Sequence, residues 1–200
     1  TNVMLQDGRL ATGSFEGIVK IWSVLDGKCR FTLTGHVDGT MYIVNLRDNR
    51  LASWSNEGKI IKIWDTLDGK CLLTLVGHTC VIMDMIELQD GRIATCSDGD
   101  EGNIKIWDPL NGKCRLTLTG HSGLVLRIIE LRGDRLMSTS LDGTLRIWGT
   151  LDGKCLFVSE GDSWSNGMIQ LQDDLLTAAA PKGAIRILST RDGKCLFTLS

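Results

Sequence analysis

The sequence predicts an all-β fold made of five four-stranded antiparallel units. A phrase that ends in Gly-Lys-Cys recurs five times, at separations of 40 to 43 residues, which indicates a repeated structural unit. Short runs rich in Ile, Val, Leu, Thr and aromatic residues are bounded by Gly, Asp and Asn, which is typical of strands. No segment keeps a helical period over about ten positions, so we expect strands alone.

The second repeat shows the strand pattern of one unit. Its strands a, b, c and d are predicted at residues 41–46, 50–55, 59–64 and 71–76. The other copies follow the same pattern, which divides the chain into units of about 1–34, 35–76, 77–119, 120–159 and 160–200. Because one such unit cannot bury both faces alone, we expect the units to pack radially against one another.

Tight turns are predicted at two places in each unit. Pairs of Asp, Asn and Gly stand between strands a and b, and again between strands c and d, as in Asp48-Asn49 and Asp68-Gly69. These residues accept the positive φ of hairpin turns, and both turns fall on one edge of the sheet. The b–c and d–a connections share the opposite edge, where length and composition vary. A variable loop face is typical of a binding scaffold.

Composition and charge argue against several kinds of partner. The chain has 200 residues, of which 42% are hydrophobic and 23% charged, and its net charge is -2. Acids and bases are interspersed, so neither nucleic acid nor a membrane surface is an expected partner. No apolar run approaches the roughly 20 residues that span a bilayer, and no signal peptide opens the chain. We therefore expect a soluble chain.

Five of the seven cysteines belong to the repeats: Cys29, Cys71, Cys114, Cys155 and Cys195. No two of them have the short spacing of a zinc site or a redox dithiol, so we expect no metal and no cofactor. Equivalent positions in successive units also lie too far apart for a disulfide. We expect these five cysteines to act as small, buried apolar side chains. Cysteines outside disulfides suit a reducing compartment, so we expect the protein in the cytoplasm or the nucleus.

The repeats share two motifs with one family. A Gly-His dipeptide opens three repeats, and an Ile-Trp dipeptide occurs in four. These motifs end at His36, His78, His121, Trp22, Trp64, Trp107 and Trp148. With the period, they resemble the WD40-repeat family over essentially the whole chain. The resemblance implies a β-propeller of four-stranded blades and a domain without enzymatic activity that binds a protein or peptide.

The resemblance also implies a hydrogen-bonded chain in each blade, from an acid through His and Ser or Thr to Trp. The fourth repeat matches this chain residue by residue, with Asp142, His121, Ser138 and Trp148. The matching residues of the other repeats are His36, Ser53, Glu57 and Trp64; His78, Thr95, Glu101 and Trp107; and Thr12, Glu16 and Trp22. In the third repeat, Asp98 and Asp100 are alternatives to Glu101 as the acid.

A Ser, a His and an Asp in one network also suggest a hydrolase. A catalytic triad is needed once, whereas this set recurs and its hydroxyl residue is joined to a Trp. A connected network satisfies a buried indole, hydroxyl and imidazole together, so we expect a structural role and no catalytic residue. The alternatives are a regulatory or substrate-recognition segment of a larger protein and, less favoured, an enzyme with a site in the central channel.

Two repeats depart from the pattern. The fifth has Asp162, Lys182 and Leu188 where the His, the acid and the Trp are expected. The first would have its His six residues before Thr1, so the chain is expected to begin inside a d–a connection. Family propellers most often have seven blades, and we expect a segment of a longer propeller. A complete five-bladed ring, a designed protein and an assembly closed by a second chain stay open.

Aromatic and long apolar residues that the repeat does not require are the candidate partner-binding residues. They are Trp54, Trp164, Phe15, Leu141, Tyr42, Met41, Met83 and Leu126. Trp54 stands where the other copies have smaller residues, and Phe15 and Leu141 directly precede the b–c acids. Packing between blades is the alternative for these residues; for Trp54 and Trp164 we favour a surface role. We expect the set to form an adaptable apolar surface for a protein or peptide.

Overall fold

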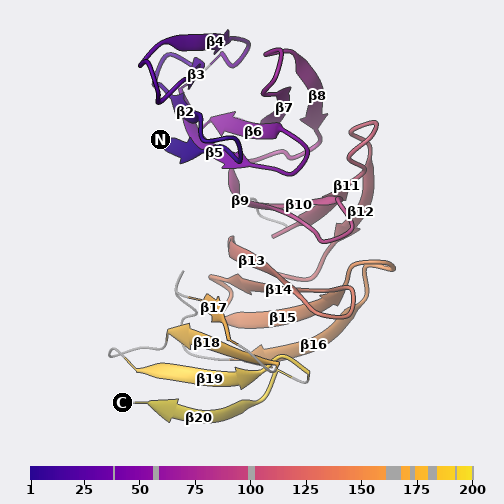
Figure 1. Cartoon of the computed structure of the whole chain (residues 1–200). Helices are drawn as coiled ribbons and strands as arrows, with labels where there is room; N and C mark the ends of the chain where they lie inside the picture. Colours follow the sequence, from indigo (N-terminus) through magenta and orange to yellow (C-terminus); the bar gives the residue numbers. More distant parts are fainter. Residues whose placement is uncertain are drawn as a thin grey trace. The chain divides into compact units, whose positions relative to one another are not determined.

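The computed structural model describes residues 1–37, 39–55, 59–98, 102–160, 168–171, 174–179, 184–191 and 193–199. These residues form five four-stranded sheets, and within each sheet the strands lie side by side in chain order (Figure 1). The five antiparallel units predicted from the sequence are thereby confirmed. In this part of the chain no helix is long and apolar enough to cross a membrane.

The strands have the following bounds. The first sheet contains β1 (Asn2–Met4), β2 (Leu10–Gly13), β3 (Val19–Trp22) and β4 (Cys29–Leu33). The second contains β5 (Thr40–Asn45), β6 (Arg50–Ser55), β7 (Ile60–Asp65) and β8 (Cys71–Val76). The third contains β9 (Ile82–Glu87), β10 (Ile93–Ser97), β11 (Ile104–Trp107) and β12 (Cys114–Leu118). The fourth contains β13 (Val125–Leu131), β14 (Arg135–Ser140), β15 (Thr144–Gly149) and β16 (Cys155–Glu160). The fifth contains β17 (Met168–Gln170), β18 (Leu175–Ala179), β19 (Ile185–Ser189) and β20 (Cys195–Leu199).

The turn residues adopt the backbone conformation that the sequence predicts. Asp48 and Asn49, between β5 and β6, both have φ of 56°, as a two-residue hairpin turn with two left-handed positions requires. Between the third and fourth strands of each sheet, one glycine has φ between 63° and 76°. At one of them, Gly69, a Cβ atom would also lie 2.9 Å from the ring of Phe31. This turn therefore needs glycine both for its backbone and for its packing on β4 of the preceding sheet.

The chain divides into two compact units, and apolar side chains pack neighbouring sheets face to face within each. The first unit comprises residues 1–82, 89–92 and 107–114, and the second comprises 83–88, 93–106 and 115–200. In the first unit, Ile21 of β3 and Leu33 of β4 share one buried cluster with Trp64 of β7. Each fully buried side chain of this size contributes roughly 1.5 to 3 kcal/mol, so sheet-on-sheet contact holds the unit together.

The second unit repeats this packing at two sheet interfaces. Ile106 of β11 and Trp148 of β15 belong to one buried cluster, which joins the third and fourth sheets. Ile147 of β15 and Leu188 of β19 belong to another, which joins the fourth and fifth. The neighbours Ile147 and Trp148 thus point to opposite faces, because side chains alternate along a strand. This alternation lets β15 contribute an apolar side chain to each of the two interfaces.

Arginine side chains add polar ties between neighbouring sheets, which the sequence analysis did not anticipate. Arg9, at the a–b turn of the first sheet, donates from Nη1 to the backbone oxygen of Thr66 at 2.6 Å. Arg135 makes the same contact with the backbone oxygen of Thr190 at 2.6 Å. Each guanidinium therefore joins the turn edge of one sheet to the c–d turn of the next.

The prediction of buried repeat cysteines is wrong. Cys29, Cys71, Cys114, Cys155 and Cys195 are all exposed, whereas Cys96 is buried. Each repeat cysteine opens the fourth strand of its sheet, which has no neighbouring strand beyond it, and the first residues of these strands face solvent. The thiol of Cys29 is satisfied locally, donating to the backbone oxygen of Phe31 at 3.3 Å.

Candidate functional site

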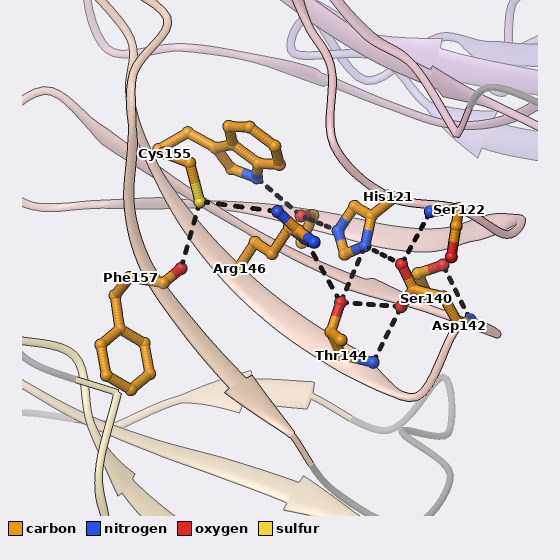
Figure 2. A network of polar contacts seen from close by, with 10 residues as sticks. His121, Ser122, Ser140, Asp142, Thr144, Arg146, Cys155 and Phe157 are labelled. Atoms are coloured by element: carbon orange, nitrogen blue, oxygen red, sulfur yellow. Dashed lines mark hydrogen bonds and ion pairs between the residues drawn. The ribbon is translucent and has the colours of Figure 1, made fainter.

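The fourth sheet brings together the four side chains of the predicted network. The indole of Trp148 donates from Nε1 to Oγ of Ser138 at 2.8 Å. On its other side this hydroxyl lies 2.7 Å from Nε2 of His121, whose Nδ1 lies 2.8 Å from Oδ2 of Asp142. Figure 2 shows His121 beside Asp142 and Thr144. A d–a connection, a b–c connection and two strands are thus joined by one line of contacts.

Strand pairing explains why the hydroxyl and the indole meet. Ser138 of β14 is opposite Arg146 of β15, and Trp148 lies two residues further along the same face. Such diagonal neighbours are within reach of an aromatic side chain. The side chains of Ser138 and Trp148 are 0% and 1% exposed, so each needs its partner inside the protein. The guanidinium of Arg146 lies 5.9 Å from the centre of the Trp148 ring and covers it.

The direction of the hydrogen bonds follows from the chemistry of each group. Burial lowers the pKa of His121 although Asp142 opposes this effect, so the imidazole is neutral near pH 7. The carboxylate of Asp142 only accepts, so Nδ1 of His121 carries the proton and Nε2 accepts from the hydroxyl of Ser138. The same hydroxyl oxygen accepts from Trp148. Every donor in this line therefore has an acceptor.

Thr144 supports Asp142 and was missed in the sequence analysis. Burial would raise the pKa of Asp142, but hydrogen bonds from the Thr144 hydroxyl and N–H, from His121 and from the Ser122 N–H outweigh it and lower that pKa to about 2. The Thr144 hydroxyl and N–H lie 2.7 and 2.8 Å from Oδ1 of the carboxylate. The sequence does show a hydroxyl residue two positions after the acid, and this spacing could have indicated the contact.

The lowered pKa of Asp142 predicts a pH-dependent contribution to stability. The contribution is complete above the ordinary pKa of 3.8 and is lost as the pH falls through the folded value of about 2. Asp142→Asn should be less stable than the wild type by about 1 to 2 kcal/mol at about pH 6. This difference should shrink between about pH 4 and about pH 2, as measured by urea unfolding. A difference that stays constant over that range would contradict the assignment.

The other sheets contain parts of the same network. In the second sheet, Oγ of Ser53 lies 2.7 Å from both Nε2 of His36 and Nε1 of Trp64. In the third sheet, His78 meets Trp107 edge to face at 5.9 Å, and Thr95 is buried. In the first sheet, Trp22 donates to Thr12 at 2.8 Å, and Glu16 is exposed. Glu57 and Glu101 lie outside the described residues.

The prediction that Trp54 lies on the surface is wrong. Its side chain is 2% exposed, and its Nε1 donates to the backbone oxygen of Ile82 at 3.0 Å. The equivalent Cys96 donates to the backbone oxygen of Val125 at 3.5 Å. At a third equivalent position, Gly13, a Cβ atom would lie 2.9 Å from the Thr40 oxygen. This position on the second strand therefore faces the first strand of the next sheet, and Trp54 fills that interface.

The other candidate partner-binding residues divide into exposed and packed side chains. Phe15 and Leu141 are 83% and 67% exposed at the tips of b–c connections. Tyr42 is 38% exposed and stacks on Trp54 at 5.1 Å. Met83 and Leu126 are half-buried. Trp164 and the side chain of Met41 lie outside the described residues.

Further exposed apolar side chains were missed in the sequence analysis. Val37, directly after His36, is 95% exposed on the same loop edge. On the opposite edge, Leu25 and Leu110 at the c–d turns are 101% and 88% exposed. Their positions next to a turn or loop motif could have indicated from the sequence that these apolar side chains are exposed.

The described residues offer little to a hydrolase. The hydroxyl oxygen of Ser138 is buried and already contacts Trp148 and His121, so no substrate carbonyl can reach it. Among the residues whose placement the structure gives, no group of three or more His, Cys, Asp or Glu could hold a metal ion. The set of polar side chains is therefore arranged as a tie between loop and sheet.

Comparisons with known proteins agree with this architecture. The family described as WD domain, G-beta repeat, or WD40, matches residues 69–108 and 112–149. The computationally designed Ika8 protein is similar in structure, with a TM-score of 0.79 and 22% identity, over 96% of this chain and 58% of that chain. A chain of the Mitotic Checkpoint Complex is similar with a TM-score of 0.81 and 19% identity, over 99% of this chain and 65% of that one. This chain thus spans less than two thirds of either structure. No curated protein matches it.

Proposed function

We propose that this chain, a set of β-propeller blades with WD40 repeats at residues 69–108 and 112–149, is a noncatalytic scaffold whose b–c and d–a loop edge binds a protein or peptide. WD40 propellers generally serve as protein-interaction scaffolds, and one of the similar structures is a protein complex. The five exposed thiols favour a reducing compartment, such as the cytoplasm or the nucleus.

The exposure of Phe15 and Leu141 is the observation that carries this proposal. Both are large apolar side chains at b–c connections, and folding leaves them 83% and 67% exposed. Neither contributes to the buried clusters between sheets. Large apolar side chains that stay in water on a rigid scaffold are the kind that anchor a partner. The contact between Asp142 and His121 holds the b–c connection that presents Leu141.

Replacing both residues with alanine tests the proposal. Phe15→Ala with Leu141→Ala should reduce capture of the bound protein from lysate at least about tenfold, because interface anchors commonly contribute about 2 kcal/mol or more. The melting temperature should stay within about 2 °C, since both side chains are exposed. Captured proteins are identified and quantified by mass spectrometry.

The opposite edge supplies a matched control. Leu25→Ala with Leu110→Ala also removes two exposed apolar side chains, at c–d turns. This variant should capture the same proteins as the wild type. If the turn variant loses them and the loop variant keeps them, the binding surface is the turn edge and the proposal is wrong.

A further inference from the structure

The outermost strand of the fourth sheet, β16, leaves two apolar side chains in solvent. Leu156 and Val158 are 54% and 43% exposed, and they lie two residues apart, so they share one face of the strand. At the position of Leu156, β4 has Arg30 and β12 has Arg115. A charged side chain there protects an edge strand from pairing with another chain, and β16 lacks this protection.

The backbone of β16 is available for pairing on its outer side. Among the described residues β16 pairs with β15 and lies at the end of its sheet. Gly149 donates its N–H to the backbone oxygen of Lys154, so every second residue of β15, including Ile147, directs its backbone groups toward β16. Phe157 lies opposite Ile147 and is bonded to it in this way. The residues on either side of Phe157 therefore direct their N–H and C=O groups away from the sheet.

The sequence of β16 is complementary to itself when two copies run antiparallel. Lys154 directly precedes the strand, and Glu160 ends it. In a register centred on Phe157, residue 154 of one copy lies opposite residue 160 of the other, and Leu156 lies opposite Val158. Two-fold symmetry makes each of these pairs occur twice. This register places opposite charges together and pairs the exposed apolar side chains, and both kinds of cross-strand pair are stabilising.

The hydrogen-bonding pattern allows the same register. Leu156 and Val158 both direct their backbone groups outward, so placing them opposite each other gives a hydrogen-bonded pair. A shift by one residue would place an outward-directed residue opposite an inward-directed one and break the ladder. A shift by two residues would keep the ladder but separate the charges.

A second apolar edge strand lacks this complementarity. In β8, Leu72 and Val76 are 47% and 65% exposed, so its edge is as apolar as that of β16. In the equivalent register, however, Lys70 would lie opposite Val76. The charge at the end of β16 therefore distinguishes it from β8.

We propose that two copies of this chain associate through antiparallel pairing of their β16 strands, in the register centred on Phe157. Seven residues from each copy form a small interface, so the dimer is weak. It is separate from the proposed loop-edge function, which depends on the exposed side chains of Phe15 and Leu141.

Sedimentation velocity over about 5 to 500 µM, a range suited to a small interface, measures the association. The wild type should change from monomer to dimer within this range. Leu156→Lys should weaken the dimer at least about tenfold, because it places a charge on the pairing edge. Leu72→Lys, the same change on β8, should leave the dimer unchanged. A wild type that stays monomeric over the whole range, or equal effects of the two variants, would overturn the proposal.

Exchanging the charges tests the register itself. Lys154→Glu and Glu160→Lys each place like charges opposite one another twice, so each should weaken self-association about tenfold. An equimolar mixture of the two variants restores both opposite-charge pairs and should associate as strongly as the wild type, which also shows that both variants are folded. A mixture that associates no better than its components would overturn the proposal. Phe15→Ala with Leu141→Ala should form the dimer as the wild type does, which separates this test from that of the proposed function.

Discussion

Replacing Trp54 with alanine is expected to lower the free energy of unfolding by about 3 to 5 kcal/mol, the range for removing a large buried aromatic side chain. The indole is 2% exposed, donates to Ile82 and stacks on Tyr42. The substitution therefore leaves a cavity between β6 and the following sheet and an unpaired backbone oxygen. Denaturant unfolding followed by circular dichroism measures the change.

Trp54→Phe separates the volume of the side chain from its hydrogen bond. Phenylalanine keeps most of the ring but lacks the N–H group that reaches Ile82, so we expect a smaller loss of about 1 to 2 kcal/mol. If alanine at this position costs less than about 1 kcal/mol, which is usual for an exposed residue, the burial of Trp54 is contradicted.

Replacing Ser138 with alanine is expected to cost about 2 to 4 kcal/mol. The hydroxyl is 0% exposed and is shared by Trp148 and His121. Its removal leaves a buried indole N–H and a buried imidazole nitrogen without partners, and each such group costs about 1 to 3 kcal/mol. The free energy of unfolding from urea titration measures this effect.

An exposed serine beside the same network is the control. Ser122 contacts Asp142 through its backbone N–H, so Ser122→Ala keeps the contact and should change stability by less than about 0.5 kcal/mol. Both variants should bind the captured partner as the wild type does. A Ser138→Ala variant that lost its partner at unchanged stability would show that this hydroxyl acts at the binding surface.

Local patterns made much of the fold predictable from the sequence. Hairpin turns such as Asp48-Asn49 depend on a few adjacent residues, so they could be located without knowledge of the rest of the chain. The strand bounds follow from the same local signals. The polar network was expected from the resemblance to the WD40 family, and the register of β14 and β15 explains why Ser138 and Trp148 meet.

Contacts between sheets could not be predicted from local sequence patterns. The sequence shows that Trp54 is unusually large for its position in a strand. Its burial depends on the first strand of the next sheet, which packs against it. Arg9 reaches a backbone oxygen 57 residues away, and no local pattern indicates such a partner. The repeat cysteines were misassigned for a related reason, since a small apolar residue in a strand is buried only where another element covers it.

The central claim is that His121 and Ser138 form one structural tie between a loop connection and its sheet. A double-mutant cycle on His121→Ala and Ser138→Ala tests this claim most directly, with the unfolding free energies of the wild type, both single variants and the double variant. We predict a coupling energy of about 1 to 2 kcal/mol, because either substitution alone removes the shared contact. Additive effects within about 0.5 kcal/mol would contradict the tie.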